Sequence, residues 1–138
     1  MKIDAIQNGV VIDHITAGRG MRLYELLGLE QLDCSVAIIK NVSSPKLGKK
    51  DIIKIDAEVT LDLDIIGYVD PDATVNIIRG GELVEKTAIA APAVLKNVIH
   101  CKNPRCITSV EQELDHIFKQ SETDKTVYRC LYCETKAN

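Results

Sequence analysis

The sequence has 138 residues, 46% of them hydrophobic, which is enough for one ordinary domain or two small ones with a buried core. Its 17 Lys and Arg are outnumbered by 20 Asp and Glu, and its aromatic residues are one Phe, four Tyr and no Trp. This composition disfavours nucleic-acid binding, because phosphate contacts need many basic side chains and base stacking needs aromatic ones.

No run approaches the roughly 18 consecutive apolar residues of a membrane helix, which excludes a membrane-spanning protein. Residues 1–5 show no apolar signal region. We therefore expect a protein of the reducing cytoplasm.

The first part of the chain predicts a hairpin followed by a helix. Apolar residues alternate with polar ones through residues 2–15 around Asn8-Gly9, a dipeptide typical of tight turns, so two paired strands are expected. Between Gly18 and Gly28, apolar residues recur every three or four positions, as on one stripe of an amphipathic helix. Gly28 is expected to end that helix.

The next segments predict two strands joined by a loop. Residues 32–42 are apolar on both faces, which favours a central, covered strand. Cys34 has no cysteine or histidine near it in sequence, so we expect a buried core thiol. After a loop at residues 43–48, residues 49–56 alternate as a further strand.

Residues 59–69 are ambiguous. They alternate like a strand, yet a short helix capped by Thr60 and ending before Gly67 fits them as well. Residues 74–90 then predict two strands of a final hairpin that turns at Gly80-Gly81.

Together these elements predict an α+β domain over residues 1–93, in which an antiparallel sheet carries two helices on one face in a ferredoxin-like arrangement. Residues 94–138 are then a small all-β domain. A segment that short rarely folds without a metal or disulfides, because its core is too small.

Four of the five cysteines form two close pairs, Cys101-x4-Cys106 and Cys130-x2-Cys133. Paired spacing of this kind is typical of a structural zinc site, in which two loops turn four sulfurs toward one Zn²⁺. Four thiolates leave no open position for a catalytic water, so one structural zinc per chain is expected.

Other interpretations of the four cysteines are two disulfides, a redox dithiol or unrelated buried thiols. A reducing compartment disfavours disulfides, and Cys130-Leu131-Tyr132-Cys133 does not lie beside a thioredoxin-like strand-to-helix turn. His100 and His116 could replace a cysteine as ligands, but four cysteines suffice.

Several dispersed stretches, in order along essentially the whole chain, resemble the regulatory chain of aspartate carbamoyltransferase. They are Gly9-Val10-Val11-Ile12-Asp13-His14-Ile15, Gly48-Lys49-Lys50-Asp51-Ile52-Ile53-Lys54-Ile55, Ala73-Thr74-Val75-Asn76, and the two cysteine pairs with Glu134. The resemblance implies a non-catalytic subunit in pyrimidine biosynthesis. Its first domain would bind nucleotide effectors (CTP, UTP or ATP) and pair with a second regulatory chain, and its zinc domain would contact the catalytic chain.

The resemblance also implies a nucleotide site that maps, position by position, onto Ile3, Asp4, Ala5, Ile6, Asp13, His14, Lys54, Asn76, Ile78, Leu83 and Lys86. Lys86 and His14 can offer positive charge to a triphosphate, and Lys54 can reach ribose or base oxygens. Asp13 can accept from a ribose hydroxyl, and backbone groups of an edge strand near Ala5 and Ile6 can pair with a base edge. No Walker loop or activated nucleophile accompanies them, which favours binding without turnover.

One position departs from the family. Gly81 stands where well-studied members carry an aromatic residue close to the base, which implies weaker base recognition. Taken singly, Lys54 or Lys86 is more often a solvated charge, and Asp13-His14 can be a surface pair. Two other functions stay open on the residues alone: a free-standing zinc-ribbon nucleic-acid-binding protein, and an enzyme that uses Asp13 and His14.

Overall fold

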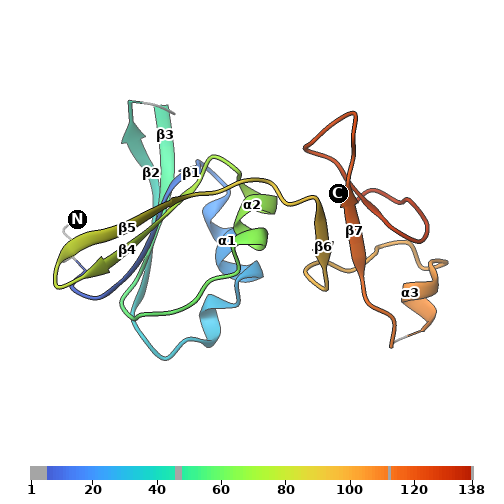
Figure 1. Ribbon diagram of the computed structural model, residues 1–138, viewed down its shortest axis with the longest axis horizontal. Helices are drawn as coiled ribbons and strands as arrows, with labels where there is room; N and C mark the ends of the chain where they lie inside the picture. The colour runs from blue at the N-terminus through green and yellow to red at the C-terminus, as the bar shows by residue number, and fades with distance from the viewer. Residues whose placement is uncertain (1–5, 46–47, 112, 138) are drawn as a thin grey trace. The chain divides into compact units, whose positions relative to one another are not determined.

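The structure, a computed structural model, describes residues 6–45, 48–111 and 113–137 (Figure 1). The chain divides into two compact units, Met1–Ala90 and Ala91–Asn138. None of the helices in the described part of the chain reaches the length and hydrophobicity of a membrane-crossing segment.

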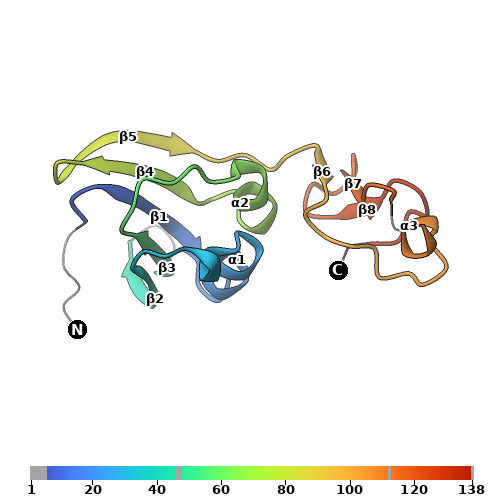
Figure 2. The same ribbon diagram turned by 90° about the horizontal axis from the view of Figure 1, so that it is seen from below.

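The first unit is an antiparallel sheet with two helices, which confirms the predicted α+β class. Its strands lie in the order β2-β3-β1-β4-β5, and every pairing is antiparallel. The helices α1 and α2 lie next to each other on one side of the sheet (Figure 2). Along the chain the elements are β1 (Gly9–Thr16), α1 (Gly20–Leu26), the 3-10 helix η1 (Leu29–Gln31), β2 (Val36–Ser44), β3 (Gly48–Ile55), α2 (Leu63–Val69), β4 (Thr74–Arg79) and β5 (Glu82–Ala88).

The core of the first unit follows from the two-residue period of its strands. Successive side chains of a strand point to opposite faces of the sheet, so alternate apolar residues meet the helices. The buried set comes from β1, β3 and β4 on one side and from α1, η1 and α2 on the other, with Ala73 just before β4; it is Val10, Ile12, Ile15, Leu23, Leu29, Ile53, Ile55, Ile66, Val69, Ala73 and Val75. The other face of the sheet carries Lys50, Lys54 and Asn76 together with some apolar residues such as Val11.

The predicted hairpin at Asn8-Gly9 is wrong. β1 begins at Gly9 and is the middle strand of the sheet, with β3 on one side and β4 on the other. Both of its hydrogen-bonding edges are therefore occupied, and residues 6–8 cannot pair with it. Instead Asn8 Oδ1 accepts a hydrogen bond from the N–H of Gly80, so this segment supports the distant β4–β5 turn. The strand predicted before Asn8 lies mostly outside the described residues.

The central position predicted for residues 32–42 is also wrong. β2 covers Val36–Ser44 and lies at the edge of the sheet, where it pairs with β3 alone. Its apolar residues on both faces are half-buried, and Cys34 before it is likewise only partly buried against the core. Apolar residues on both faces therefore did not mark a central strand here. They belong to an edge strand whose side chains remain partly exposed in the single chain.

The ambiguous segment 59–69 contains the helix α2. Asp62, not Thr60, caps it, because the Asp62 carboxylate accepts from the N–H groups of Asp64 and Ile65. Gly67 lies inside the helix and does not follow it. A Cβ at Gly67 would lie 2.1 Å from the carbonyl oxygen of Ala90, so the close approach of that chain segment explains the glycine.

Other local predictions are confirmed. Gly28 ends α1 in the left-handed conformation with φ of 67°. β4 and β5 form the predicted hairpin, and Gly80 and Gly81 both have positive φ, 60° and 78°. Such a two-residue turn matches the twist of the flanking strands.

The second unit is a three-stranded antiparallel sheet in the order β6-β7-β8. Its elements are β6 (Val94–Lys96), a single helical turn α3 (Ile107–Val110), β7 (Ile117–Gln120) and β8 (Tyr128–Cys130). Among the described residues of this unit, α3 is the departure from the predicted all-β content. Its buried side chains include Leu95, Phe118, Tyr128, Thr108 and three of the cysteines. So small a core is consistent with a requirement for metal.

Candidate functional site

The four paired cysteines converge in the second unit. Cys101 follows β6, Cys106 is the N-cap residue of α3, Cys130 ends β8 and Cys133 lies in the turn after it. Their sulfur atoms all lie within 4.8 Å of one another. The Sγ atoms of Cys101 and Cys133 are 3.5 Å apart, and those of Cys106 and Cys130 are 3.7 Å apart.

These distances fit a zinc tetrathiolate and not disulfides. A tetrahedron with Zn–S bonds of about 2.3 Å has sulfur–sulfur edges of roughly 3.8 Å. A disulfide bond is only about 2.05 Å long, and all five cysteines are free thiols. Each of these two contacts joins one cysteine of the first pair to one of the second, which is the arrangement of one shared metal site and not of a separate Cys130–Cys133 dithiol. The chain holds one structural zinc on these four sulfurs.

The surroundings of the sulfurs differ. Hydrogen bonds from Thr135 lower the pKa of the Cys133 thiol to about 6, and those from Thr108 lower the pKa of Cys106. Burial instead raises the pKa of Cys130, and raises that of Cys101 to about 12. Zinc binding overrides these differences, because the metal takes all four cysteines as thiolates.

The two histidines near the centre are not ligands. The backbone N–H of Cys101 donates a hydrogen bond to Nδ1 of His116 at 3.4 Å, so this ring contacts the backbone of the loop that carries Cys101. The rings of His100 and His116 contact each other, with centroids 4.2 Å apart.

A row of predicted nucleotide residues crosses the outer face of the large sheet, the face opposite the helices. Lys54 on β3 lies opposite Val11 on β1, Val11 lies opposite Asn76 on β4, and Asn76 lies opposite Lys86 on β5. Directly opposed residues of neighbouring strands point to the same face. Three residues that are far apart in sequence therefore share one surface.

Asp13 lies on the same outer face beside a bulge in β1. The register of β1 against β3 shifts between Ile12 and Ile15, and His14 within this shift has a positive φ of 57°. The backbone N–H of His14 donates to Asp13 Oδ1 at 2.6 Å, and His14 Nδ1 lies 3.1 Å from Thr74 Oγ1. Asp13 still pairs with Thr74 in the regular register of β1 and β4, so the irregularity is confined to the side of β1 that faces β3.

The sequence interpretation missed Lys50. Its Nζ atom lies 2.9 Å from Asp13 Oδ1, so Asp13 is already ion-paired. Lys50 and Lys54 are four residues apart on one alternating strand, and this even spacing would have placed both on the same face.

The remaining predicted residues are placed in part. Ile78 and Leu83 are register partners at the end of the β4–β5 hairpin, and Leu83 is 55% exposed. Ile6 is half-buried and does not belong to a strand. Ile3, Asp4 and Ala5 lie outside the described residues.

Asn76, in the middle of the row, has an unsatisfied polar atom. Its Oδ1 is buried and has no hydrogen-bond partner among the residues that the structure describes. A buried acceptor without a partner costs free energy, and most such atoms in folded proteins are satisfied. A donor from a ligand, or from a residue outside the described ranges, would satisfy this atom if it reached it.

Gly81 is required by the turn. Its φ is 78°, and a Cβ at this position would lie 3.0 Å from Gln7 Oε1. The N–H of Gly81 donates to the carbonyl oxygen of Gln7 at 2.9 Å. An aromatic residue here would be strained on this backbone, whatever relatives carry at the position.

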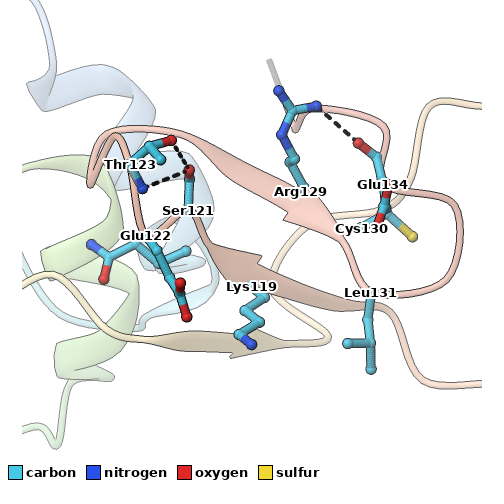
Figure 3. A pocket seen from close by; sticks show the side chains of 9 residues that line it. Lys119, Ser121, Glu122, Thr123, Arg129, Cys130, Leu131 and Glu134 are labelled. Carbon is cyan, nitrogen blue, oxygen red and sulfur yellow. Dashed lines mark hydrogen bonds between the residues drawn. The ribbon is translucent and has the colours of Figure 1, made fainter.

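A shallow depression of about 450 Å³ lies in the second unit, and it contains none of the predicted nucleotide residues. Figure 3 shows its side chains, with the Arg129 guanidinium beside the backbone carbonyl of Glu134 at 3.1 Å. It is lined by Lys119, Gln120, Ser121, Glu122, Thr123, Arg129, Cys130, Leu131 and Glu134.

The fold and the thiolate centre define a two-domain chain in which a ferredoxin-like α+β unit is followed by a structural zinc unit. Two family models match it: the allosteric domain of the aspartate carbamoyltransferase regulatory chain over residues 1–90, and the metal-binding domain of the same chain over residues 93–138. The chain belongs to the family of aspartate carbamoyltransferase regulatory chains.

Curated relatives agree over nearly the full length. The aspartate carbamoyltransferase regulatory chain of Clostridium botulinum strain Hall is 45% identical over 97% of this chain and 92% of its own. The corresponding chain of Clostridium tetani is 44% identical over 97% and 94%, and that of Bifidobacterium longum is 39% identical over 99% of each. These are regulatory and not catalytic chains, as the sequence resemblance indicated, and the enzyme alternative with Asp13 and His14 is wrong.

Proposed function

We propose that this chain binds nucleoside triphosphates on the outer face of the large sheet and transmits their effect to catalytic chains of aspartate carbamoyltransferase. The observation that carries the proposal is the row from Lys54 through Asn76 to Lys86, with the unsatisfied Asn76 Oδ1 at its centre.

The length and charge of the row suit an extended nucleotide. Lys54 and Lys86 are three strand spacings apart, or about 14 Å, so the two cations can serve different parts of one ligand. Lys86 on the exposed edge strand β5 is suited to phosphates, which need point charges more than shape. Lys54 is half-buried and is suited to the ribose or base.

Asn76 and Asp13 supply acceptors between the cations. A ligand hydroxyl or amine that donates to Asn76 Oδ1 would satisfy an atom that no described residue satisfies. Asp13 can accept from a ribose hydroxyl while it keeps Lys50, since a carboxylate can accept several hydrogen bonds. His14 beside the bulge remains a candidate contact to phosphate.

The zinc unit is proposed as the contact with the catalytic chain. Monomeric soluble proteins rarely expose large apolar side chains in groups, and such groups often mark protein interfaces. This small unit exposes several, at between 43% and 68% of their surface: Val94, Ile107, Val110, Leu131 and Tyr132. We further propose that the first unit pairs with its copy in a regulatory dimer.

Calorimetric titration of the full chain with CTP, UTP and ATP, each with and without Mg²⁺, tests the sensor role. Carbamoyltransferase assays of catalytic chains mixed with this chain, with and without each nucleotide, test the transmission. The proposal requires saturable binding and an activity change that depends on both nucleotide and chain. Heat changes equal to those of dilution for all three nucleotides would exclude the sensor role.

A further inference from the structure

Two threonines occupy equivalent positions beside the thiolate centre. Thr108 follows Cys106 by two residues, and Thr135 follows Cys133 by two residues. The Oγ1 atom of Thr108 lies 3.1 Å from Cys106 Sγ, and the Oγ1 atom of Thr135 lies 3.2 Å from Cys133 Sγ. One sulfur of each cysteine pair therefore has a hydroxyl at hydrogen-bonding distance.

Different local structures hold the two hydroxyls in place. Thr108 lies in the helical turn α3 and is only 4% exposed, so its hydroxyl is shielded from water. Thr135 lies in the turn after β8, where its carbonyl oxygen accepts from the N–H of Cys130 at 2.9 Å. Each threonine is thus fixed to the ligand turn on which its partner sulfur lies.

With zinc bound, the direction of these hydrogen bonds is defined. A metal-bound thiolate has no proton and can only accept, so the threonine hydroxyl is the donor in both contacts. Four thiolates on one Zn²⁺ leave an excess of negative charge in a largely buried place. Such charge is costly unless hydrogen bonds disperse it.

We propose that Thr108 and Thr135 are positioning residues of the zinc centre, whose hydroxyls donate to the Cys106 and Cys133 thiolates and thereby retain the metal. The two hydroxyls orient their sulfurs and withdraw electron density from them. Partners of this kind around metal ligands commonly matter as much as the ligand geometry itself.

Variants of the full chain that differ by one hydroxyl test the proposal. Thr108→Val and Thr135→Val keep the side-chain shape but remove the donor, and each is expected to weaken zinc affinity roughly 10- to 100-fold. Competition with a chromophoric zinc chelator measures the affinity and the rate of zinc release. Thr108→Ser and Thr135→Ser keep the hydroxyl and are expected to retain zinc like the wild type.

Thr126→Val is the matched control. Its hydroxyl donates to Asp124 Oδ1 at 2.6 Å at an exposed site of the same unit, so its loss should leave zinc affinity unchanged. Thr135 is less buried than Thr108, so Thr135→Val carries the test by itself if the Thr108→Val chain does not fold.

Cobalt substitution supplies a spectroscopic measurement that would not change if the two threonines served only to pack the ligand turns. Removing a donor raises the electron density on the thiolate, so the sulfur-to-cobalt charge-transfer bands of the Co²⁺-loaded Val variants should shift to lower energy. Val variants with wild-type zinc affinity and unshifted bands would overturn the proposal. Ser variants that lose zinc as readily as the Val variants would overturn it too, since packing and not the hydroxyl would then matter.

Discussion

Lys50 Nζ lies 2.9 Å from Asp13 Oδ1 on the outer face of the large sheet, and the two side chains are only 15% and 21% exposed. The contact joins β3 to β1 beside the bulge that carries His14. It places a third cation next to the row formed by Lys54, Asn76 and Lys86, which already contains two.

Replacing Lys50 by Met is expected to raise the pKa of Asp13. Burial alone would raise that pKa, but the hydrogen bonds from Lys50 and from the His14 N–H, with the charge of Lys50, hold it below its ordinary value of 3.8. Carbon-13 NMR titration of the Asp13 carboxyl measures the change. Lys49→Met, on the other face of the same strand, is the control, and an equal pKa in both variants would contradict the assignment.

The same pair predicts a pH dependence of stability. Because the folded-state pKa of Asp13 is depressed, its stabilising contribution is complete above the unfolded-state pKa and is lost as pH falls through the folded value. Urea unfolding between neutral and strongly acidic pH should therefore show a smaller loss of stability for Lys50→Met than for the wild type. Identical pH profiles would show that the pair contributes nothing to folding.

Lys86→Ala is expected to weaken the binding of CTP and of ATP by a similar factor. Losing charge-assisted hydrogen bonds costs roughly 1.5 to 3 kcal/mol, which corresponds to about tenfold to a hundredfold in affinity. The factor should be the same for both nucleotides, because phosphates carry no base identity. Calorimetry measures it, with exposed Lys49→Ala as the control. Equal affinities in Lys86→Ala and wild type would reduce Lys86 to a solvated surface charge.

Cys130→Ser and Cys133→Ser are expected to unfold residues 94–138 and to leave the large sheet intact. Each removes one of the four sulfurs that lie within 4.8 Å of one another, and we expect so small a unit to depend on the metal for its folding. Metal analysis should find one zinc per wild-type chain, and hydrogen exchange should show lost protection only in the second unit. Cys34→Ser, at the cysteine outside the cluster, is the control. A zinc-free wild-type chain that stayed folded throughout would contradict this prediction.

Gly81→Ala is expected to destabilise the first unit. The left-handed conformation costs a residue with a Cβ about 1 to 2 kcal/mol, and the new atom would also approach Gln7 Oε1 at 3.0 Å. Gly81→Asn should cost less, because Asn tolerates positive φ better than Ala. Urea unfolding measures both. Tyr also has a Cβ, so Gly81→Tyr would strain the turn in the same way. Its effect on nucleotide affinity would reflect that strain before it reflected base recognition.

Much of the local structure follows from the sequence alone. The alternation in residues 49–56 predicted β3, the glycine after the apolar stripe predicted the end of α1, and Gly80-Gly81 predicted the last hairpin. The pairing of cysteines predicted the zinc centre. These features depend on residues that are close in sequence or on a metal with strict ligand requirements, so a short pattern contains the necessary information.

Only the tertiary structure decided how the strands are ordered. β1 lies between β3 and β4 and not in a hairpin at Asn8-Gly9, and β2 lies at the edge although its apolar residues indicated a central strand. The alternation of residues along a strand determines which side chains share a face. Which strands lie beside it depends instead on hydrogen bonds to segments that are distant in sequence. Lys54, Asn76 and Lys86 become one row because the register of each strand pair is settled by the packed fold as a whole.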